Sequence, residues 1–289
     1  MTVLVLGSAN ADLVVPVPRR PAAGETVLGG DTTVLPGGKG ANTAVAAARL
    51  GADVSFAGAV GDDRHGELLR RSLASSGVRT GHLRTSGRPT GVAYITVTPD
   101  GENSIVVAPG ANADVSEADV DALTWDGVAV LVCSLEVPVP TVAHAVAAAA
   151  SRGARPLLNL SPVVEVPAET LALLDPLVVN EHEAASLAPS FEALLDLGPR
   201  SAVVTLGARG AAVVTREGVV EVAAPPVSAV DTTGAGDAFA GALAAGLAAG
   251  SSLVDAAAFA ARVAALSVTS AGAQPSYPTR AEVDRLRTG

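Results

Sequence analysis

The chain has 289 residues, 49% of them hydrophobic, so it can bury a large core. Its formal net charge of −10 and pI of about 4.8 argue against binding to the phosphate backbone of a nucleic acid. The only cysteine, Cys133, excludes an intramolecular disulfide and is typical of a reducing compartment. The first residues read as a strand rather than an export signal, and no stretch has the roughly 20 strongly apolar residues of a membrane span. We therefore expect a soluble cytoplasmic protein.

Short apolar runs alternate with helical patterns along most of the chain, which predicts a mostly parallel sheet covered on both faces. We expect buried strands at residues 2–6, 54–60, 128–133, 156–159, 177–179 and 202–206. Helices are expected from the glycine turn at 37–40 to Gly51, from 61 to Gly77, at 140–152, 168–174, 181–197, 236–250 and 252–270, and briefly from 279.

Two hairpins are expected as well, at residues 91–108 around PDGEN and at 210–224. The first alternates apolar and polar residues, so we place it in a half-exposed sheet of its own. Together with the early segments VVPVP and TVLGG it would form a small lid of about four strands.

Residues 231–241, DTTGAGDAFAG, place two aspartates around a Gly-Ala-Gly turn directly before an Ala-rich helical stretch. Such a turn presents backbone N–H groups at the positive end of the helix dipole, which suits a phosphoryl group. Asp237 at this helix start is suited to accept a proton from an attacking hydroxyl. The alternative is that Asp237 only completes a helix cap.

Two other segments place polar side chains beside glycines or after a strand. In residues 36–42, PGGKGAN, the glycines let the backbone approach a ligand closely, and Lys39 and Asn42 offer groups for hydroxyls; the alternative is a tight turn. Asn10 and Asp12 follow the first strand, where open parallel sheets bind ligands, and Asp12 can accept from two hydroxyls of a polyol. An Asx turn is the alternative there.

Two segments in the second half have weaker patterns. Asn180 and Glu183 have the spacing of a capping box, or else lie near a hydrated Mg²⁺ and nucleotide phosphates, since magnesium needs few protein ligands. Residues 267–278, SVTSAGAQPSYP, form either a plain loop or one whose carbonyls join those near Asp231 around a monovalent cation.

Together these segments resemble the PfkB carbohydrate kinase family, and within it the ribokinases, over nearly the whole chain. GSANAD, PGGKGAN, TGVAYI, the N-x-x-E pair, TLGARG, DTTGAGDAF and GAQPS occur in the family's order. The resemblance implies one ribokinase-like domain over residues 1–289. Its fold would be a three-layer α/β sandwich with a mostly parallel central sheet and lid strands from about 12–36 and 90–108. The region 187–200 is shorter than is usual for the family.

The resemblance also implies a role for each matching residue. Asp237 would deprotonate the primary hydroxyl of the sugar, while Gly234, Ala235 and Gly236 would form the anion hole. The implied sugar contacts, besides Asp237, are Asn10, Asp12, Gly37, Gly38, Lys39, Asn42 and Glu136. The implied nucleotide contacts are Asn180, Glu183, Thr205, Gly207 and Gly236, with Glu183 reaching Mg²⁺ through water. A potassium-type ion would lie among Asp231, Thr233, Ser267, Ser270, Gly272 and Ser276.

The implied activity is ATP-dependent phosphorylation of the 5-hydroxyl of D-ribose, with Mg²⁺ and K⁺, by a homodimer that pairs through the lid. Alternative substrates are 2-deoxyribose, a nucleoside or a ketohexose. A nucleoside site needs apolar or aromatic walls, and aromatic residues make up only 2% of this chain, so a small free pentose is favoured. A sugar-binding regulator without catalysis is the alternative of another class, which the intact Asp237 and glycine turn disfavour.

Overall fold

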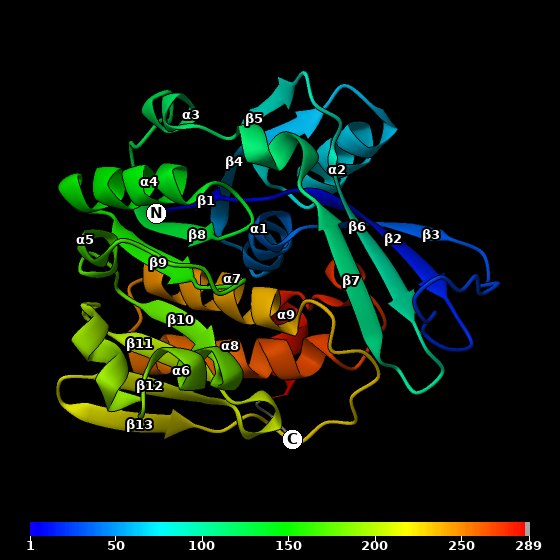
Figure 1. Ribbon diagram of the computed structural model, residues 1–289. Coiled ribbons are helices and arrows are strands. Elements are labelled where there is room, and N and C mark those ends of the chain that lie inside the picture. The colour runs from blue at the N-terminus through cyan, green and yellow to red at the C-terminus, as the bar shows by residue number, and fades with distance from the viewer. Residues whose placement is uncertain (287–289) are drawn as a thin grey trace.

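The computed structural model describes residues 1–286, which form two β-sheets with helices packed around the larger one (Figure 1). The strands are β1 (Thr2–Leu6), β2 (Asn10–Pro16), β3 (Thr33–Gly37), β4 (Asp53–Gly61), β5 (Arg79–Ser86), β6 (Gly91–Val97), β7 (Asn103–Ala108), β8 (Val128–Ser134), β9 (Arg155–Asn159), β10 (Leu177–Asn180), β11 (Ala202–Thr205), β12 (Ala211–Thr215) and β13 (Gly218–Val222).

The α-helices are α1 (Lys39–Arg49), α2 (Arg64–Ser75), α3 (Glu117–Asp121), α4 (Val139–Ser151), α5 (Ala168–Leu171), α6 (Glu181–Leu187), α7 (Ala235–Ala248), α8 (Leu253–Ser267) and α9 (Arg280–Arg285). Short 3₁₀ helices are η1 (Gly110–Asp114), η2 (Glu192–Leu197), η3 (Gly207–Arg209) and η4 (Gln274–Ser276). Among residues 1–286, no helix is both long and apolar enough to cross a membrane.

The larger sheet has nine strands in the order β13-β12-β11-β10-β9-β8-β1-β4-β5. The seven neighbouring strands β11-β10-β9-β8-β1-β4-β5 pair in parallel, and only β12 runs in the opposite direction, antiparallel to both β11 and β13. The carboxyl ends of the parallel strands therefore lie along one edge, where ligands bind in open α/β sheets. The expected mostly parallel sheet is confirmed.

The two faces of this sheet are covered by separate apolar clusters. Along β1, Val3 and Val5 belong to the cluster that includes α1, α7 and α8, whereas Leu4 and Leu6 belong to the cluster that includes α4. A strand points successive side chains to opposite faces, so a continuous apolar run is buried on both sides. Cys133 is buried in the second cluster, and burial raises the pKa of its thiol well above the usual range.

The smaller sheet has the order β3-β2-β6-β7 and projects from one side of the α/β body (Figure 1). β2 pairs in parallel with β6, and β3 and β7 are the antiparallel edges. The four-stranded sheet is confirmed, but one of its predicted segments is wrong. The strand is Thr33–Gly37 rather than residues 26–30, because β3 must pair with β2 in a register that sets Gly37 opposite Asn10.

Two other expectations differ from the structure. The helix expected over residues 181–197 is divided into α6 and η2, because Pro189 lies between them and cannot continue a helix. The edge strand β5 was not anticipated, since RTGHLRTS is polar and only half buried, as suits a strand with one neighbour.

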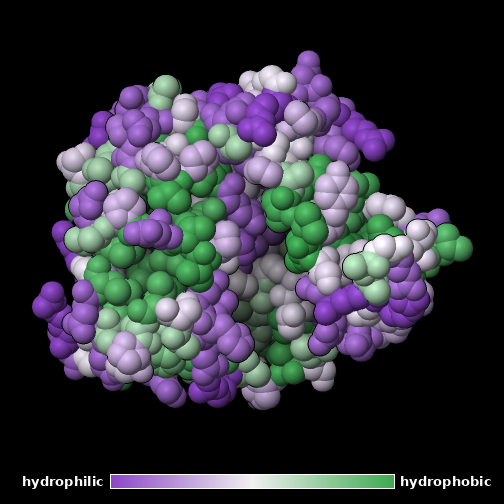
Figure 2. All heavy atoms as spheres, viewed as in Figure 1, coloured by the Kyte–Doolittle hydropathy of each residue, from purple (hydrophilic) through white to green (hydrophobic). Residues whose placement is uncertain are grey.

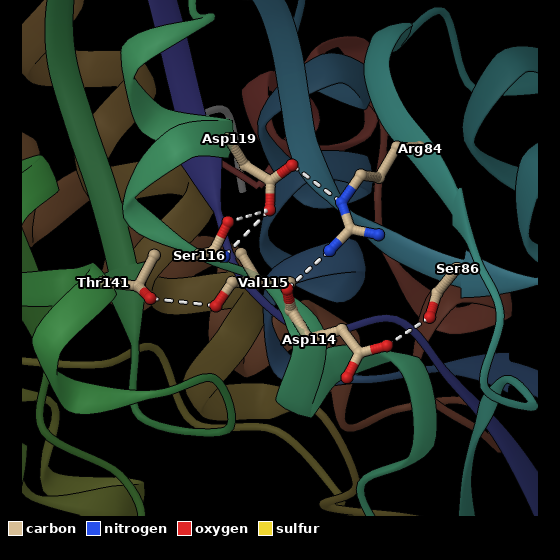
Figure 3. Close-up of polar contacts among 7 residues, drawn as sticks. All are labelled: Arg84, Ser86, Asp114, Val115, Ser116, Asp119 and Thr141. Atoms are coloured by element: carbon tan, nitrogen blue, oxygen red, sulfur yellow. Dashed lines mark hydrogen bonds and ion pairs between the residues drawn. The ribbon is translucent and has the colours of Figure 1, made fainter.

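The chain between β7 and α4 is anchored by polar contacts (Figure 3). Arg84 of β5 donates to the Asp119 carboxylate at 2.7 Å and to the Asp114 carbonyl at 2.5 Å. The Thr141 hydroxyl donates to the Val115 carbonyl at 2.9 Å. This segment carries a buried asparagine of the site described next.

Candidate active site

Helix α7 begins directly after Gly234, whose backbone has the left-handed conformation. Gly234 has φ of 74°, and a Cβ on it would collide with the Tyr277 hydroxyl and with Ala273, so only glycine fits this turn. Ala235, Gly236 and Asp237 form the first helical turn. The Ala235 N–H donates to the Thr232 carbonyl at 3.2 Å, which leaves Gly236 and Asp237 as the better placed N–H donors for an anion.

The carboxylate of Asp237 is buried, with 7% of the residue exposed. Its Oδ2 accepts a hydrogen bond of 2.9 Å from Asn42 Nδ2. Burial raises the pKa of Asp237 to about 6; Lys39 and the Asn42 bond act against this rise, and Glu136 adds to it. A carboxylate with such a pKa can accept a proton near neutral pH.

Helix α1 supplies the residues opposite Asp237. Gly38, with φ of 90°, begins the helix, and a Cβ there would collide with the backbone of Ala9 and Asn10. Lys39 and Asn42 then stand in the first turns of α1, so the predicted PGGKGAN segment does face residues 234–237 across the site.

The small sheet brings Asp12 and Asn10 to the same place. A Cβ on Gly37 would overlap the Asp12 carboxylate, so the glycine makes room for this side chain. Burial raises the pKa of Asp12 to about 7, and the charges of Glu136 and Asp237 add to the rise. Three carboxylates thus lie within electrostatic reach of one another.

Glu136, in the loop after β8, joins several of these segments. Its Oε2 accepts from the Ser8 hydroxyl at 2.5 Å, from the Lys39 backbone N–H at 3.2 Å and from Asn10 Nδ2 at 3.4 Å. The carboxylate therefore satisfies the first N–H of α1 while it holds the Asn10 amide.

A pocket of about 160 Å³ adjoins the turn at 234–237 and opens toward β10 and β11. Eight predicted residues line it, namely Lys39, Asn180, Glu183, Thr205, Gly234, Ala235, Gly236 and Asp237. Gly207 begins η3 and is not among the lining residues. Asn159, Ser161 and Thr232 also line the pocket and were missed. Asn159 ends β9, so the rule for strand ends could have indicated it.

Asn180 and Glu183 form the capping box that their spacing predicted as the alternative. Asn180 Oδ1 accepts from the Glu183 N–H at 2.8 Å, and Glu183 Oε2 accepts from the Asn180 N–H at 2.7 Å. Both residues also line the pocket, and Glu183 Oε1 is not used by the box. The capping role and a place in the pocket are therefore compatible.

The predicted cation residues lie on two loops that are tied together. The backbone N–H groups of Val230 and Asp231 donate to the Val268 carbonyl at 2.7 and 3.2 Å, and Asp231 Oδ2 accepts from the Gly272 N–H at 2.8 Å. Partial burial acts to raise the pKa of Asp231, but its hydrogen bonds with Thr233 and Gly272 outweigh burial and lower it.

The three serines predicted as cation ligands give less support to a cation site. The Ser267 and Ser276 hydroxyls donate to the Ala264 and Ala273 carbonyls, and Ser270 is exposed. A cation between the loops would therefore be held mainly by backbone oxygens.

Three buried residues behind the site were not singled out by the sequence. Asn112 Nδ2 donates to Asn10 Oδ1 at 2.7 Å, and Gln274 Nε2 donates to Asn42 Oδ1 at 3.0 Å. The Tyr277 hydroxyl donates to the Gly234 carbonyl at 3.1 Å. Asn112 has no local pattern that points to the site. Gln274 and Tyr277 lie in the loop at 267–278, which the sequence singled out for a cation, but their contacts with Asn42 and Gly234 arise only through the fold.

These residues lie where the small sheet faces the α/β body, and Figure 2 shows a hollow between the two. The polar side chains that suit the hydroxyls of a sugar lie between Asp237 and the small sheet. The pocket lies on the other side of Asp237, beyond the glycine turn. The arrangement suits transfer of a phosphoryl group from one ligand to a hydroxyl of another.

Comparison with known proteins agrees with this chemistry. Residues 2–280 match the pfkB family of carbohydrate kinases. The chain is 42% identical to the ribokinase of Bacillus subtilis over 98% of each chain, and 36% identical to the deoxyribokinase of Salmonella typhi over 96% of each. The structure of Arabidopsis thaliana ribokinase complexed with ribose and ATP is similar, with 33% identity, a TM-score of 0.89 and coverage of 98% of this chain and 97% of that one. The fold is therefore ribokinase-like, and the chain belongs to the pfkB family of carbohydrate kinases.

Proposed function

We propose that this chain transfers the γ-phosphoryl group of ATP to the primary 5-hydroxyl of D-ribose, giving ribose 5-phosphate. The observation that carries the proposal is the buried Asp237 carboxylate in the first turn of α7, held by Asn42 and directly beside the N–H groups that follow Gly234. Asp237 takes the hydroxyl proton, and Gly236 with its neighbours donates to the oxygens of the transferring group.

The sugar lies between the small sheet and α1. Asp12 accepts from two hydroxyls, while Lys39 and the amides of Asn10 and Asn42 donate. Glu136 keeps the Asn10 amide and the start of α1 in place. Gly37 leaves room for the Asp12 carboxylate and Gly38 lets α1 begin against the backbone of Ala9 and Asn10. In this proposal both glycines contact the sugar through their backbone.

Ribose is preferred over 2-deoxyribose in this proposal because the chain is more similar to the Bacillus subtilis ribokinase than to the Salmonella typhi deoxyribokinase. The two sugars differ by one hydroxyl, and a site built to bond a hydroxyl discriminates strongly against the analogue that lacks it. The ratio of kcat/KM for ribose to that for 2-deoxyribose therefore measures this preference.

ATP occupies the pocket beyond the turn, with its phosphates directed to Gly236 and with Thr205 and Gly207 beside the nucleotide. Among residues 1–286, no three or more His, Cys, Asp or Glu side chains gather as a metal cage. Glu183 Oε1, which the capping box leaves unused, would bond a water of a magnesium ion, since magnesium is held largely by phosphates and water. Magnesium neutralises charge on the transferring group when bound.

A monovalent cation of the potassium type lies between the loops at 231–233 and 267–276. The lowered pKa of Asp231 keeps this carboxylate ionised, and the two loops are already tied by Val268 and Gly272. Both observations fit a cation held by an aspartate and backbone oxygens.

The small sheet also supports a homodimer. Val34, Tyr94 and Val106 lie on one face of the small sheet and are 40%, 53% and 69% exposed, and β3 and β7 are unpaired edges within the described residues. An exposed apolar sheet with open edges is a surface that a second copy can cover. Sedimentation velocity tests this: a monomer at micromolar concentration contradicts it.

The decisive experiment is a coupled assay of ADP release with ribose, 2-deoxyribose, fructose, adenosine and inosine, each with Mg-ATP. We expect kcat/KM to be highest for ribose. Turnover that is highest for another acceptor would replace the substrate, and turnover on none would contradict the proposed reaction. Detection of ribose 5-phosphate by ³¹P NMR checks the site of transfer.

A further inference from the structure

A continuous chain of hydrogen bonds, buried except for its partly buried first bond, leads to Asp237 from Ser72 of α2. The Ser72 hydroxyl of α2 donates to Gln274 Oε1 at 2.6 Å, and Gln274 Nε2 donates to Asn42 Oδ1 at 3.0 Å. Asn42 Nδ2 then donates to Asp237 Oδ2 at 2.9 Å. Gln274 and Asn42 are 3% and 5% exposed, so water cannot replace these partners freely.

Each group in this series donates a hydrogen bond to the next one toward Asp237, and this fixes the orientation of both amides. An ionised carboxylate only accepts, so Asn42 must turn Nδ2 toward Asp237 and Oδ1 away from it. Oδ1 then requires a donor, which Gln274 supplies through Nε2. The remaining oxygen of Gln274 requires a donor in turn, which is the hydroxyl of Ser72. Reversing either amide would place two acceptors or two donors against each other in a buried position.

We propose that Gln274 is a positioning residue for phosphoryl transfer: by fixing the orientation of the Asn42 amide, it keeps Asp237 an ionised acceptor aimed at the sugar hydroxyl. The inference rests on the proposed role of Asp237 as the base. Gln274 itself touches no substrate, and it acts through Asn42.

Other groups also set the charge of Asp237 and must be held constant in a test. Lys39 of α1 favours the ionised form, and Glu136 disfavours it. Asp12 of β2 and the buried Tyr277 also interact electrostatically with Asp237. A variant that changes no charge is therefore the informative one.

Gln274→Met keeps the length of the side chain and removes both amide groups. Without the donor on Oδ1, the Asn42 amide is free to turn and to present its oxygen to Asp237, which favours the protonated carboxyl. We expect kcat near neutral pH to fall roughly tenfold, with a much smaller change in KM. The acidic limb of the profile of kcat/KM against pH should move to higher pH.

A double-mutant cycle separates this role from simple packing. In an Asn42→Ala background, Gln274→Met should change neither kcat nor the acidic limb further, because the effect passes through Asn42. A packing role would give additive losses. Unchanged acidic limbs in Gln274→Met, or additivity in the cycle, would overturn the proposal.

Ser72 offers a second route if Gln274→Met folds poorly. Ser72→Ala should shift the acidic limb in the same direction by less, since Gln274 loses only its own anchor. Ser75→Ala is the matched control, because Ser75 is an exposed serine on the same helix whose hydroxyl donates only to the Ser72 carbonyl. Equal profiles of kcat/KM against pH for Ser72→Ala, Ser75→Ala and the unmodified chain would contradict the positioning role of Gln274.

A titration without turnover separates this inference from the proposed function. The carboxyl ¹³C signal of Asp237, assigned by its loss in Asp237→Asn, should titrate at higher pH in Gln274→Met than in the unmodified chain. This shift is expected even if ribose is not the acceptor. Absence of turnover on every sugar would contradict the proposed function alone. An unshifted titration of Asp237 would contradict the positioning role of Gln274 alone.

Discussion

The Tyr277 hydroxyl donates a hydrogen bond of 3.1 Å to the carbonyl oxygen of Gly234, 43 residues earlier in the chain. Gly234 is the left-handed residue from which α7 begins, and Tyr277 is almost fully buried against it. A side chain from the last loop therefore holds the peptide plane that leads into the first turn of α7.

Tyr277→Phe should leave the fold intact and lower kcat about tenfold, because the Gly234 carbonyl loses a bond worth about 1 kcal/mol and the turn loosens. Steady-state kinetics at saturating sugar and ATP measure the effect. The only other tyrosine, Tyr94, is 53% exposed on the small sheet, so Tyr94→Phe is the matched control and should keep normal turnover. Equal rates for both variants would remove Tyr277 from the site.

Asp237→Asn should lower kcat by roughly three orders of magnitude, because it removes the base, while the sugar still binds. Asp255 occupies the same third position of helix α8 and bonds the Ser252 hydroxyl, so Asp255→Asn is the matched control. Calorimetric titration with ribose measures binding in each variant. Near-normal turnover of Asp237→Asn would show that another group takes the proton.

The same substitution should stabilise the protein at pH 8. The folded-state pKa of Asp237 is raised to about 6, so the folded state holds a proton more tightly than the unfolded chain does. The free energy of unfolding therefore falls as the pH rises from about 4 to about 6, and the penalty is complete above that range. Asn carries no such penalty, so a lower Tm for Asp237→Asn than for the unmodified chain at pH 8 would contradict this.

Activity should rise with pH through the range in which Asp237 ionises. Because the pKa values of Asp237 and Asp12 are raised to about 6 and about 7, the acidic limb of kcat/KM should lie near these values rather than near 4. The two carboxylates interact, so the limb reports the pair. A profile that is flat down to pH 4.5 would contradict a buried carboxylate as the base.

Gly37→Ala should raise the KM for the sugar by at least tenfold, because the new Cβ would overlap the Asp12 carboxylate and displace it. Gly81→Ala is the matched control, since Gly81 also lies in a strand but has open space where a Cβ would stand. Initial rates at varied ribose measure both. An unchanged KM for Gly37→Ala would mean that Asp12 does not bind the sugar.

Replacing potassium by sodium should lower the rate of ADP release, since the carbonyl oxygens around the loops at 231–233 and 267–276 suit one ionic radius better than another. The measurement is the rate at constant ionic strength with either chloride salt. Asp231→Asn should reduce this difference. Equal rates with the two ions in the unmodified chain would contradict the cation site.

The sequence by itself determined much of the architecture, because its signals are local. The unbroken apolar run of β1 required burial on both faces, and the glycines at 38, 51, 77 and 234 mark turns with positive φ. Local patterns failed where the pairing between strands decides which segment becomes a strand. TVLGG reads as a strand as readily as TTVLPG, but only Thr33–Gly37 can pair with β2 and place Gly37 beneath Asp12.

The candidate site divides in the same way. The glycine turns and the residues that follow them, Lys39, Asn42 and Asp237, could be predicted because turn chemistry and helix starts are written in consecutive residues. The partners that orient them could not. Gln274 meets Asn42 from 232 positions away and Asn112 meets Asn10 from 102, and such contacts exist only once α1, the small sheet and the last loop have packed together. The sequence determined which groups carry the chemistry, and the tertiary structure alone decided how they are held.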